Sequence, residues 1–217
     1  PLALTIGDLS FRHHPEHYPP SARIRLNTLV PRQCRAARIV LTPSEFSRRD
    51  IIETYDLDPR RVAVVPNRVL EHVQVDDVTR ARSERRLREH GVRAPYVLYL
   101  GNLHPRKNVA RLIDAYRVAT DRNAELRDVQ LVIAGARWFK GGVEEAAAAR
   151  VGAGLVTLTG RVDDDVRRVL LEDAVALTYV SMFEGFGLPP IEAMAAGTPV
   201  LAGDRAATPE VCGDAAL

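Results

Sequence analysis

Residues 96–108 read YVLYLGNLHPRKN and carry the pattern that decides the fold. A short apolar run is followed by a loop, and residues 109–119 then show helical spacing of apolar side chains. A strand, a loop and a helix in this order predict one unit of a parallel sheet. The same order recurs downstream, with strands expected at 129–134, 155–159, 175–180 and 199–202 and helices at 143–151, 165–173 and 189–196. Because these strands are continuously apolar, we expect helices on both faces of an α/β sheet.

The chain upstream of this region has a different composition. It is rich in proline, and it contains a predicted strand at 38–42, a helix at 44–55 and a second short strand at 62–65. Residues 69–94 are polar and charged, and they indicate a linker that includes a solvated helix. We therefore predict a first region at 1–68, a linker at 69–94 and an α/β domain with a parallel sheet at 95–217. The chain begins with proline and stops where another element is due, so we expect it to be incomplete at both ends.

Composition and charge exclude several classes of protein. The 217 residues include 30 basic and 28 acidic ones, a net charge of +2, which provides no general field for nucleic acid. No apolar run approaches the roughly 18 residues that a membrane span needs. Two cysteines, Cys34 and Cys212, match no disulfide framework, and the first residues lack the features of a secretory signal. We expect a cytoplasmic protein that binds anions only locally.

The loop after residues 96–100 carries two adjacent cations, Arg106 and Lys107. They precede a predicted helix, where the positive end of the dipole disfavours each cation by roughly 0.3–1 kcal/mol. Loops at the carboxyl ends of parallel strands bind ligands in open α/β sheets. A bound anion, shared by both cations and the N–H groups of the helix end, would offset the repulsion. The alternative is an exposed basic pair hydrogen-bonded to a neighbouring loop, and the sequence leaves both interpretations open.

Residues 182–194, MFEGFGLPPIEAM, also connect a predicted strand to a predicted helix. Gly185 and Gly187 allow a positive φ or the close approach of a ligand to the backbone. Glu184 in the loop and Glu192 in the early turns of the helix can face one cleft. A carboxylate accepts two hydroxyl hydrogen bonds at once, which suits a ribose diol. Alternatively, Glu192 only complements the helix dipole.

These residues carry a resemblance. Glu184 and Glu192 bracket seven residues, and this spacing resembles the paired-glutamate motif of retaining nucleotide-sugar glycosyltransferases of the GT-B architecture, the glycosyl transferases group 1 family. Residues 96–108 are similar to the first strand and phosphate-binding loop of that family's donor-binding domain. Segments 44–47 (SEFS) and 64–67 (VVPN) resemble the end of its N-terminal domain, and 8–11 (DLSF) with 14–16 (HPE) resembles an earlier loop. The likeness covers nearly the whole chain in the right order. It implies that residues 1–68 are the remnant of an N-terminal, acceptor-side Rossmann-like domain and that residues 95–217 are a donor-binding Rossmann-like domain.

The resemblance implies a role for each site residue. Arg106 and Lys107 would bind the donor's diphosphate and stabilise the charge that develops on the departing nucleotide. Glu192 would hold the ribose, and Glu184 would contact the donor sugar. The other donor contacts would come from Gly101, Asn102, Arg161, Val162, Gly185, Phe186, Gly187 and Leu188.

The activity so implied is transfer of a hexose, mannose or glucose, from a nucleotide-diphosphate sugar to a hydroxyl, with retention of anomeric configuration. The expected setting is bacterial glycan or polysaccharide synthesis, with a glycan or lipid-linked acceptor and no metal or other cofactor. Peripheral membrane association would come from an N-terminal part that precedes this sequence.

One departure from the family favours an alternative. Members commonly have a histidine immediately before the aspartate of the early loop, near the transferring sugar, whereas Gly7 precedes Asp8 here. That hydrogen bond is lost unless His13, His14 or His17 replaces it. The alternative function is a non-catalytic nucleotide- or nucleotide-sugar-binding module.

Three further patterns have structural interpretations that we favour. Asp163-Asp164-Asp165 fits a loose metal-binding pattern, but it precedes a helix and predicts an N-cap with an acidic first turn. Residues 13–17, HHPEH, suggest zinc, yet the proline disrupts helical presentation and a fourth ligand is missing, so we expect a surface loop. Trp138 and Phe139 could stack on a base or sugar, but an aromatic pair after a strand is more often partial core.

Overall fold

The computed structural model describes residues 2–69, 74–138, 142–152 and 154–217. The chain divides into two compact units, and both are assembled from separate segments. The first unit comprises Pro1–Val69, Met182–Leu188 and Asp204–Gly213, and the second comprises Leu70–Ser181, Pro189–Gly203 and Asp214–Leu217.

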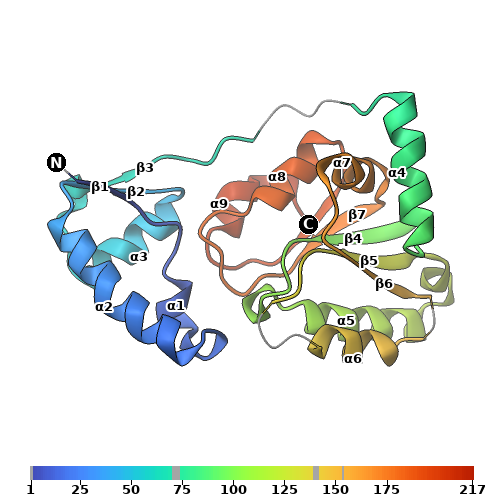
Figure 1. Cartoon of the computed structure of the whole chain (residues 1–217), viewed down its shortest axis with the longest axis horizontal. Helices are drawn as coiled ribbons and strands as arrows, with labels where there is room; N and C mark the ends of the chain where they lie inside the picture. The colour runs from blue at the N-terminus through green and yellow to red at the C-terminus, as the bar shows by residue number, and fades with distance from the viewer. Residues whose placement is uncertain (1, 70–73, 139–141, 153) are drawn as a thin grey trace. The chain divides into compact units, whose positions relative to one another are not determined.

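The second unit contains a five-stranded parallel sheet in the order β6-β5-β4-β7-β8 (Figure 1). The strands are β4 (Tyr96–Leu100), β5 (Gln130–Ala134), β6 (Val156–Gly160), β7 (Ala176–Tyr179) and β8 (Val200–Ala202). All five predicted strands are present, with ends that differ by at most one residue. In chain order the strands run third, second, first, fourth, fifth, so the topological switch point lies between β4 and β7.

Helices cover both faces of this sheet (Figure 1). One face carries α5 (Val109–Arg122) and α6 (Val143–Ala149), and the other carries α4 (Asp77–Glu89), α7 (Asp164–Asp173) and α8 (Leu188–Ala195). Alternate strand residues divide between the two cores, because successive side chains point to opposite faces. Leu98 packs in the cluster with α7 and α8, whereas Tyr99 packs in the cluster with α5 and α6. Both residues are fully buried, as the apolar strands predicted.

The helix α4 lies in the segment predicted as a linker, and it packs against α7. Leu87 of α4 is buried in the same cluster as Leu170 of α7. Arg80 pairs with both Glu172 and Asp173 at the end of α7. The sequence indicated a solvated helix, but one side of α4 is therefore part of the second unit's core. Residues 70–73 of the predicted linker lie outside the described residues.

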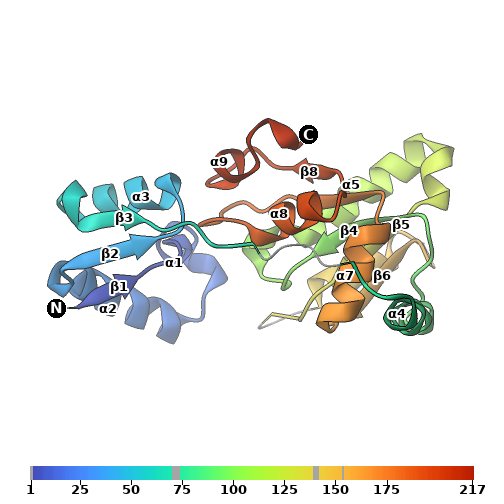
Figure 2. The same ribbon diagram turned by 90° about the horizontal axis from the view of Figure 1, so that it is seen from above.

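The first unit contains a three-stranded parallel sheet in the order β1-β2-β3. Figure 2 shows α3 on one face of this sheet and α2 on the other. The elements of this unit are β1 (Ala3–Thr5), α1 (Ser10–His13), α2 (Pro20–Ala36), β2 (Ile39–Thr42), α3 (Glu45–Tyr55), β3 (Val62–Val64) and α9 (Thr208–Cys212). The short turn of α9 returns to the N-terminus of α3, where the carboxylate of Glu210 accepts the backbone N–H groups of Glu45 and Phe46 at 2.7 and 2.8 Å.

The sequence did not predict α2, although it spans 17 residues. Pro20 stands in its first turn, where a missing N–H costs nothing, and Pro31 stands inside it. Because proline is typical of turns, the prolines at these two positions mask the helical pattern of this segment in the sequence. Among the described residues, no helix is long and apolar enough to cross a membrane.

Asp163 caps α7 as predicted: its side chain accepts the backbone N–H of Val166 at 3.0 Å and pairs with Arg86 of α4. We predict that Asp163→Ala lowers the free energy of unfolding by about 1 kcal/mol. Asp164→Ala is the matched control, because the Asp164 side chain is 84% exposed. Equal melting temperatures for the two variants would contradict the capping role.

This contribution has a defined pH dependence. The hydrogen bond from Val166, followed by Arg86, lowers the pKa of Asp163. A carboxyl with a lowered pKa in the folded state stabilises the protein above its unfolded pKa, and that contribution is lost as the pH falls through the folded value. The wild type should therefore exceed Asp163→Ala in free energy of unfolding by less at acid pH than at neutral pH. Denaturant titration at both pH values measures this difference.

Candidate functional site

The loop after β4 forms a short turn of its own before α5 begins. Pro105–Lys107 is a 3₁₀ turn, and Asn108 follows it in the left-handed region with a φ of 62°. Arg106 and Lys107 therefore lie one turn ahead of α5, which starts at Val109, and not within its first residues.

Lys107 is buried at the switch point, with 8% of its surface exposed. Its Nζ lies 3.4 Å from the hydroxyl of Tyr179, the last residue of β7, and 5.3 Å from the centre of that ring. A buried ammonium needs polar partners, and the face of an aromatic ring attracts a cation. The interpretation of an exposed basic pair therefore fails for Lys107, whereas Arg106 is half-buried. The turn after β4 and the end of β7 are thereby held together.

The N-terminus of α5 faces this turn without a side-chain cap. Asn108 is the N-cap residue, but its side chain accepts no backbone N–H. Its Nδ2 instead donates to the carbonyl of Val180, which follows β7, at 3.4 Å. The first turn of α5 contains no acidic residue. Its N–H groups are suited to bind an anion, because a helix N-terminus carries partial positive charge.

The backbone at Gly101 and Asn102 is held rigidly at the same edge. Gly101 has a φ of +147°, and the carbonyl of Asn102 accepts the hydroxyl of Tyr99 at 3.0 Å. A Cβ on Gly135, which follows β5, would lie 1.7 Å from the carbonyl oxygen of Gly101. Gly135 therefore has to be glycine, and the sequence did not reveal this requirement.

Two aromatic rings support the cationic turn. His104 is 3% exposed, and its Nδ1 accepts the backbone N–H of Arg106 at 3.2 Å. The ring of Trp138 lies 4.6 Å from the ring of His104. Trp138 thus contacts the turn, as the partial-core interpretation favoured. Phe139 lies outside the described residues.

Glu192 lies in α8, where its Oε2 is 2.7 Å from Nη1 of Arg167 in α7. The first turn of α8 contains no acidic residue, so complementing the helix dipole does not explain Glu192. The ion pair was not predicted, because the partners are 25 residues apart and lie on different helices. Arg161 and Val162 follow β6 at the same edge of the sheet; Arg161 is exposed, and Val162 packs on the cluster of α7.

The residues from Glu184 to Leu188 belong to the first unit. Glu184 is 6% exposed, and its carbonyl accepts the N–H of Ala207 at 3.2 Å. Gly187 adopts a φ of 107°, which favours glycine, and Phe186 is half-buried. Leu188 begins α8.

Gly185 is held against the early loop of the first unit. Its carbonyl accepts the hydroxyls of Ser44 and Ser47 at 2.7 and 3.2 Å, and Ser47 also donates to the carbonyl of Gly7 at 3.1 Å. A Cβ on Gly185 would lie 2.0 Å from the Gly7 oxygen. The close approach expected at Gly185 is therefore made by backbone. Ser44 also caps α3, and its N-cap pattern was the signal that could have identified it.

The histidines of the early loop lie around Phe183. The ring of His13 stacks on Phe183 with centroids 5.1 Å apart, and its Nε2 is 2.7 Å from Asp50. The ring of His14 meets Phe183 at its edge, with centroids 5.8 Å apart. A Cβ on Gly7 would meet nothing within 4 Å, so packing around this atom does not require glycine.

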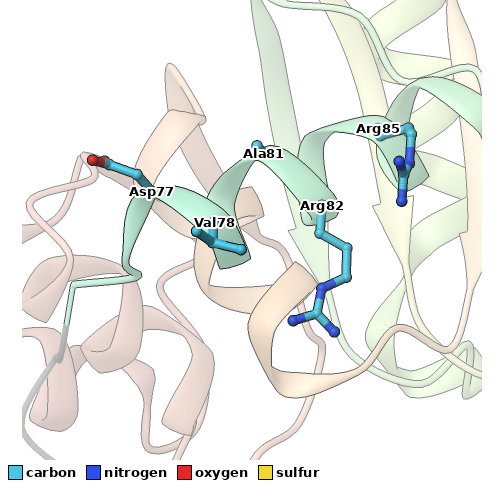
Figure 3. Close-up of a pocket in the computed structure, with 5 residues that line it drawn as sticks. All are labelled: Asp77, Val78, Ala81, Arg82 and Arg85. Carbon is cyan, nitrogen blue, oxygen red and sulfur yellow. The ribbon is translucent and has the colours of Figure 1, made fainter.

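A separate hollow of about 540 Å³ lies along α4. Figure 3 shows that its five lining side chains rise from this single helix. Arg82 and Arg85 make it basic, but it contains none of the predicted site residues. We therefore do not consider this hollow the binding site for an anion at the carboxyl ends of the strands.

The second unit thus belongs to the class of Rossmann-like nucleotide-binding folds, with a cationic turn at its switch point. The sequence model of the family described as "Glycosyl transferases group 1" matches residues 82–216. The match covers more than half of the chain, and the chain belongs to this family.

Individual relatives agree with this assignment. The chain is 30% identical to the O-antigen chain mannosyltransferase B of Escherichia coli over 98% of its own length and 55% of that protein. It is 32% identical to the MMP alpha-(1->4)-mannosyltransferase of Mycolicibacterium hassiacum, over 85% of the chain and 42% of that protein. The chain therefore spans about half the length of these curated relatives.

Solved structures show the same fold. The Anabaena protein Alr3699/HepE, crystallised with UDP and glucose, matches with a TM-score of 0.75 and 21% identity over 97% of this chain and 55% of that one. WaaG, a glycosyltransferase involved in lipopolysaccharide biosynthesis, matches with a TM-score of 0.69 and 18% identity over 97% and 58%. The fold is therefore that of GT-B glycosyltransferases, as the sequence predicted.

The contact between Gly185 and Gly7 makes a stability prediction. Gly185→Ala should lower the free energy of unfolding by about 1–3 kcal/mol, because the new methyl group would overlap the Gly7 carbonyl. Gly7→Ala is the matched control, since its methyl group would meet no atom within 4 Å. Denaturant titration measures both variants. Equal small losses would show that the two segments do not pack as described.

Proposed function

We propose that this chain is the donor-binding portion of a glycosyltransferase that moves a hexose from a nucleotide-diphosphate sugar to a hydroxyl. One observation carries the proposal: Lys107 is buried at the switch point, beside the uncapped N-terminus of α5. Two cations and a helix end at this position suit a diphosphate, which is doubly charged and needs several N–H donors. The same groups would stabilise charge on the departing nucleotide. No metal is needed in this scheme.

Glu192 is proposed to hold the ribose of the donor. Its ion pair with Arg167 fixes the direction of the carboxylate, so that it can accept the two hydroxyls of a diol. Gly101 and Asn102 would line the phosphate site with rigid backbone, and Arg161 and Val162 would approach the nucleobase. Glu184, Gly185, Phe186, Gly187 and Leu188 would contact the donor sugar.

Mannose is the proposed sugar, supported by the mannosyltransferases among the relatives, with glucose second because HepE was crystallised with glucose. We propose retention of configuration and an acceptor that is a bacterial glycan or a lipid-linked saccharide. Two buried free cysteines support a reducing, cytoplasmic setting. Peripheral membrane association would belong to sequence outside this chain.

The competing proposal is a binding module without catalysis, which the glycine at position 7 favours. Incubation of the longer natural protein with nucleotide-diphosphate mannose or glucose and a panel of glycan acceptors decides between them. A product whose new bond has the donor's anomeric configuration, read by NMR, supports the transferase. Donor binding with neither transfer nor hydrolysis supports the module.

The assignment of Arg106 and Lys107 to the diphosphate can be tested by mutation. Replacing Arg106 and Lys107 by alanine should weaken binding of a nucleoside diphosphate at least tenfold, while binding of the matching nucleoside should change little. The reason is that only the diphosphate meets the two cations. Arg122→Ala, at the exposed end of α5, is the control for net charge. Calorimetry measures both ligands, and equal losses for both would contradict the assignment.

The variant Glu192→Gln tests the proposed contact with the ribose. A ribonucleoside diphosphate should bind several-fold more weakly to the variant, whereas its 2′-deoxy counterpart should lose much less, because the carboxylate would accept the 2′-hydroxyl. Thermal melting is the control, since breaking the Arg167 pair also affects folding. The contrary outcome is a variant that melts at a lower temperature and still prefers the ribonucleoside diphosphate over its 2′-deoxy counterpart as strongly as the wild type does. In that case Glu192 has only a structural role.

A further inference from the structure

Three metal-ligating side chains converge in the first unit, in the loop that follows α1. His14, Glu16 and His17 each offer one ligand atom, and these atoms all lie within 4.8 Å of one another. Pro15–His17 forms a 3₁₀ turn, and this turn folds Glu16 and His17 back toward His14 at the end of α1. The proline thus brings the ligands together, although it prevents a continuous helix.

The carboxylate of Glu16 pairs with both histidines, at distances that also suit a metal site. Oε1 of Glu16 lies 3.4 Å from Nδ1 of His14 and 3.5 Å from Nε2 of His17. Charge-assisted hydrogen bonds are shorter, at about 2.7–2.9 Å, and the neighbouring pair of His13 and Asp50 is 2.7 Å. Ligand atoms about 2.0–2.1 Å from a tetrahedral zinc ion lie about 3.3–3.4 Å from each other. The two distances from the Glu16 oxygen match this value. Rotation of the side chains can shorten the third distance, which joins the nitrogen atoms of His14 and His17.

The surroundings also suit an ion. The rings of His14 and His17 are stacked nearly parallel, with centroids 5.4 Å apart and an angle of 11°, so one ring has to turn for both lone pairs to point at one ion. The His17 side chain is 15% exposed and that of Glu16 is 61% exposed, so an ion could enter from the solvent beside the carboxylate.

We propose that His14, Glu16 and His17 bind one Zn²⁺ ion, with water as the fourth ligand. Two imidazoles and one carboxylate with an open position form a donor set that zinc accepts. Water supplies the ligand that the sequence lacked. The ion fastens the 3₁₀ turn to the end of α1 and holds the ring of His14 at the edge of Phe183. This site acts on the conformation of the first unit, and it does not depend on the glycosyltransferase proposal.

Titration of the 217-residue chain with Co²⁺ tests the site, because tetrahedral Co²⁺ has visible absorption bands. We expect saturation at one ion per chain and displacement of the bands by Zn²⁺. His14→Ala and His17→Ala should each weaken binding at least ~10-fold, and Glu16→Gln should also weaken it. His90→Ala, an exposed histidine at the end of α4, should bind as the wild type does.

Two results would overturn the site. Equal Co²⁺ affinity for the wild type and the His14→Ala/His17→Ala double variant would mean an adventitious ion only. Loss of binding in His13→Ala, with no loss in the double variant, would move the ion to His13 and Asp50. Circular dichroism shows whether each variant is folded. A rise in melting temperature with Zn²⁺ that appears in the wild type and His90→Ala but not in the folded double variant supports the proposal independently.

Discussion

The burial of Lys107 between two adjacent parallel strands is the constraint on which the proposed site depends. At a switch point the connections from neighbouring strands leave toward opposite faces, so the carboxyl ends of β4 and β7 are not covered by their own helices. The ring of Tyr179 and the turn after β4 fill that position with an aromatic face and a cation. The uncapped N-terminus of α5 adds partial positive charge beside this cation, and the two together suit an anionic ligand.

The rest of the turn is built to keep these groups in place. His104 accepts the backbone N–H of Arg106 and contacts Trp138, and Asn108 adopts a left-handed conformation that lets α5 start in a new direction. The carbonyl of Gly101 lies so close to Gly135 that no side chain fits there. Preorganised donors cost no rearrangement when charge develops, which is what transition-state stabilisation requires. Rigidity of the backbone is therefore as much a part of the proposed site as the two cations.

The sequence predicted elements whose signal is local. Apolar runs and helical spacing located all five strands of the second unit, and the N-cap at Asp163 followed from three acidic residues before a helix. Prolines obscured α2, whose stability comes from packing on the sheet. The contact of Lys107 with Tyr179 could not be predicted, because 72 residues separate them and only the strand order brings them together. The pair of Arg167 and Glu192 likewise depends on how two helices pack.

The two glutamates of the motif are held by different parts of the chain. Glu184 belongs to the first unit and Glu192 to the second, so the chain passes between the units within the motif. At one end, Gly185 must fit against the carbonyl of Gly7, and Ser44 and Ser47 fix its own carbonyl. At the other end, Glu192 must reach Arg167 from the second turn of α8. A residue inserted or deleted within the first turn of α8 would rotate the rest of the helix by about 100° and turn Glu192 away from Arg167. Each glutamate is therefore positioned by contacts inside its own unit, and the motif is the stretch of chain that joins them.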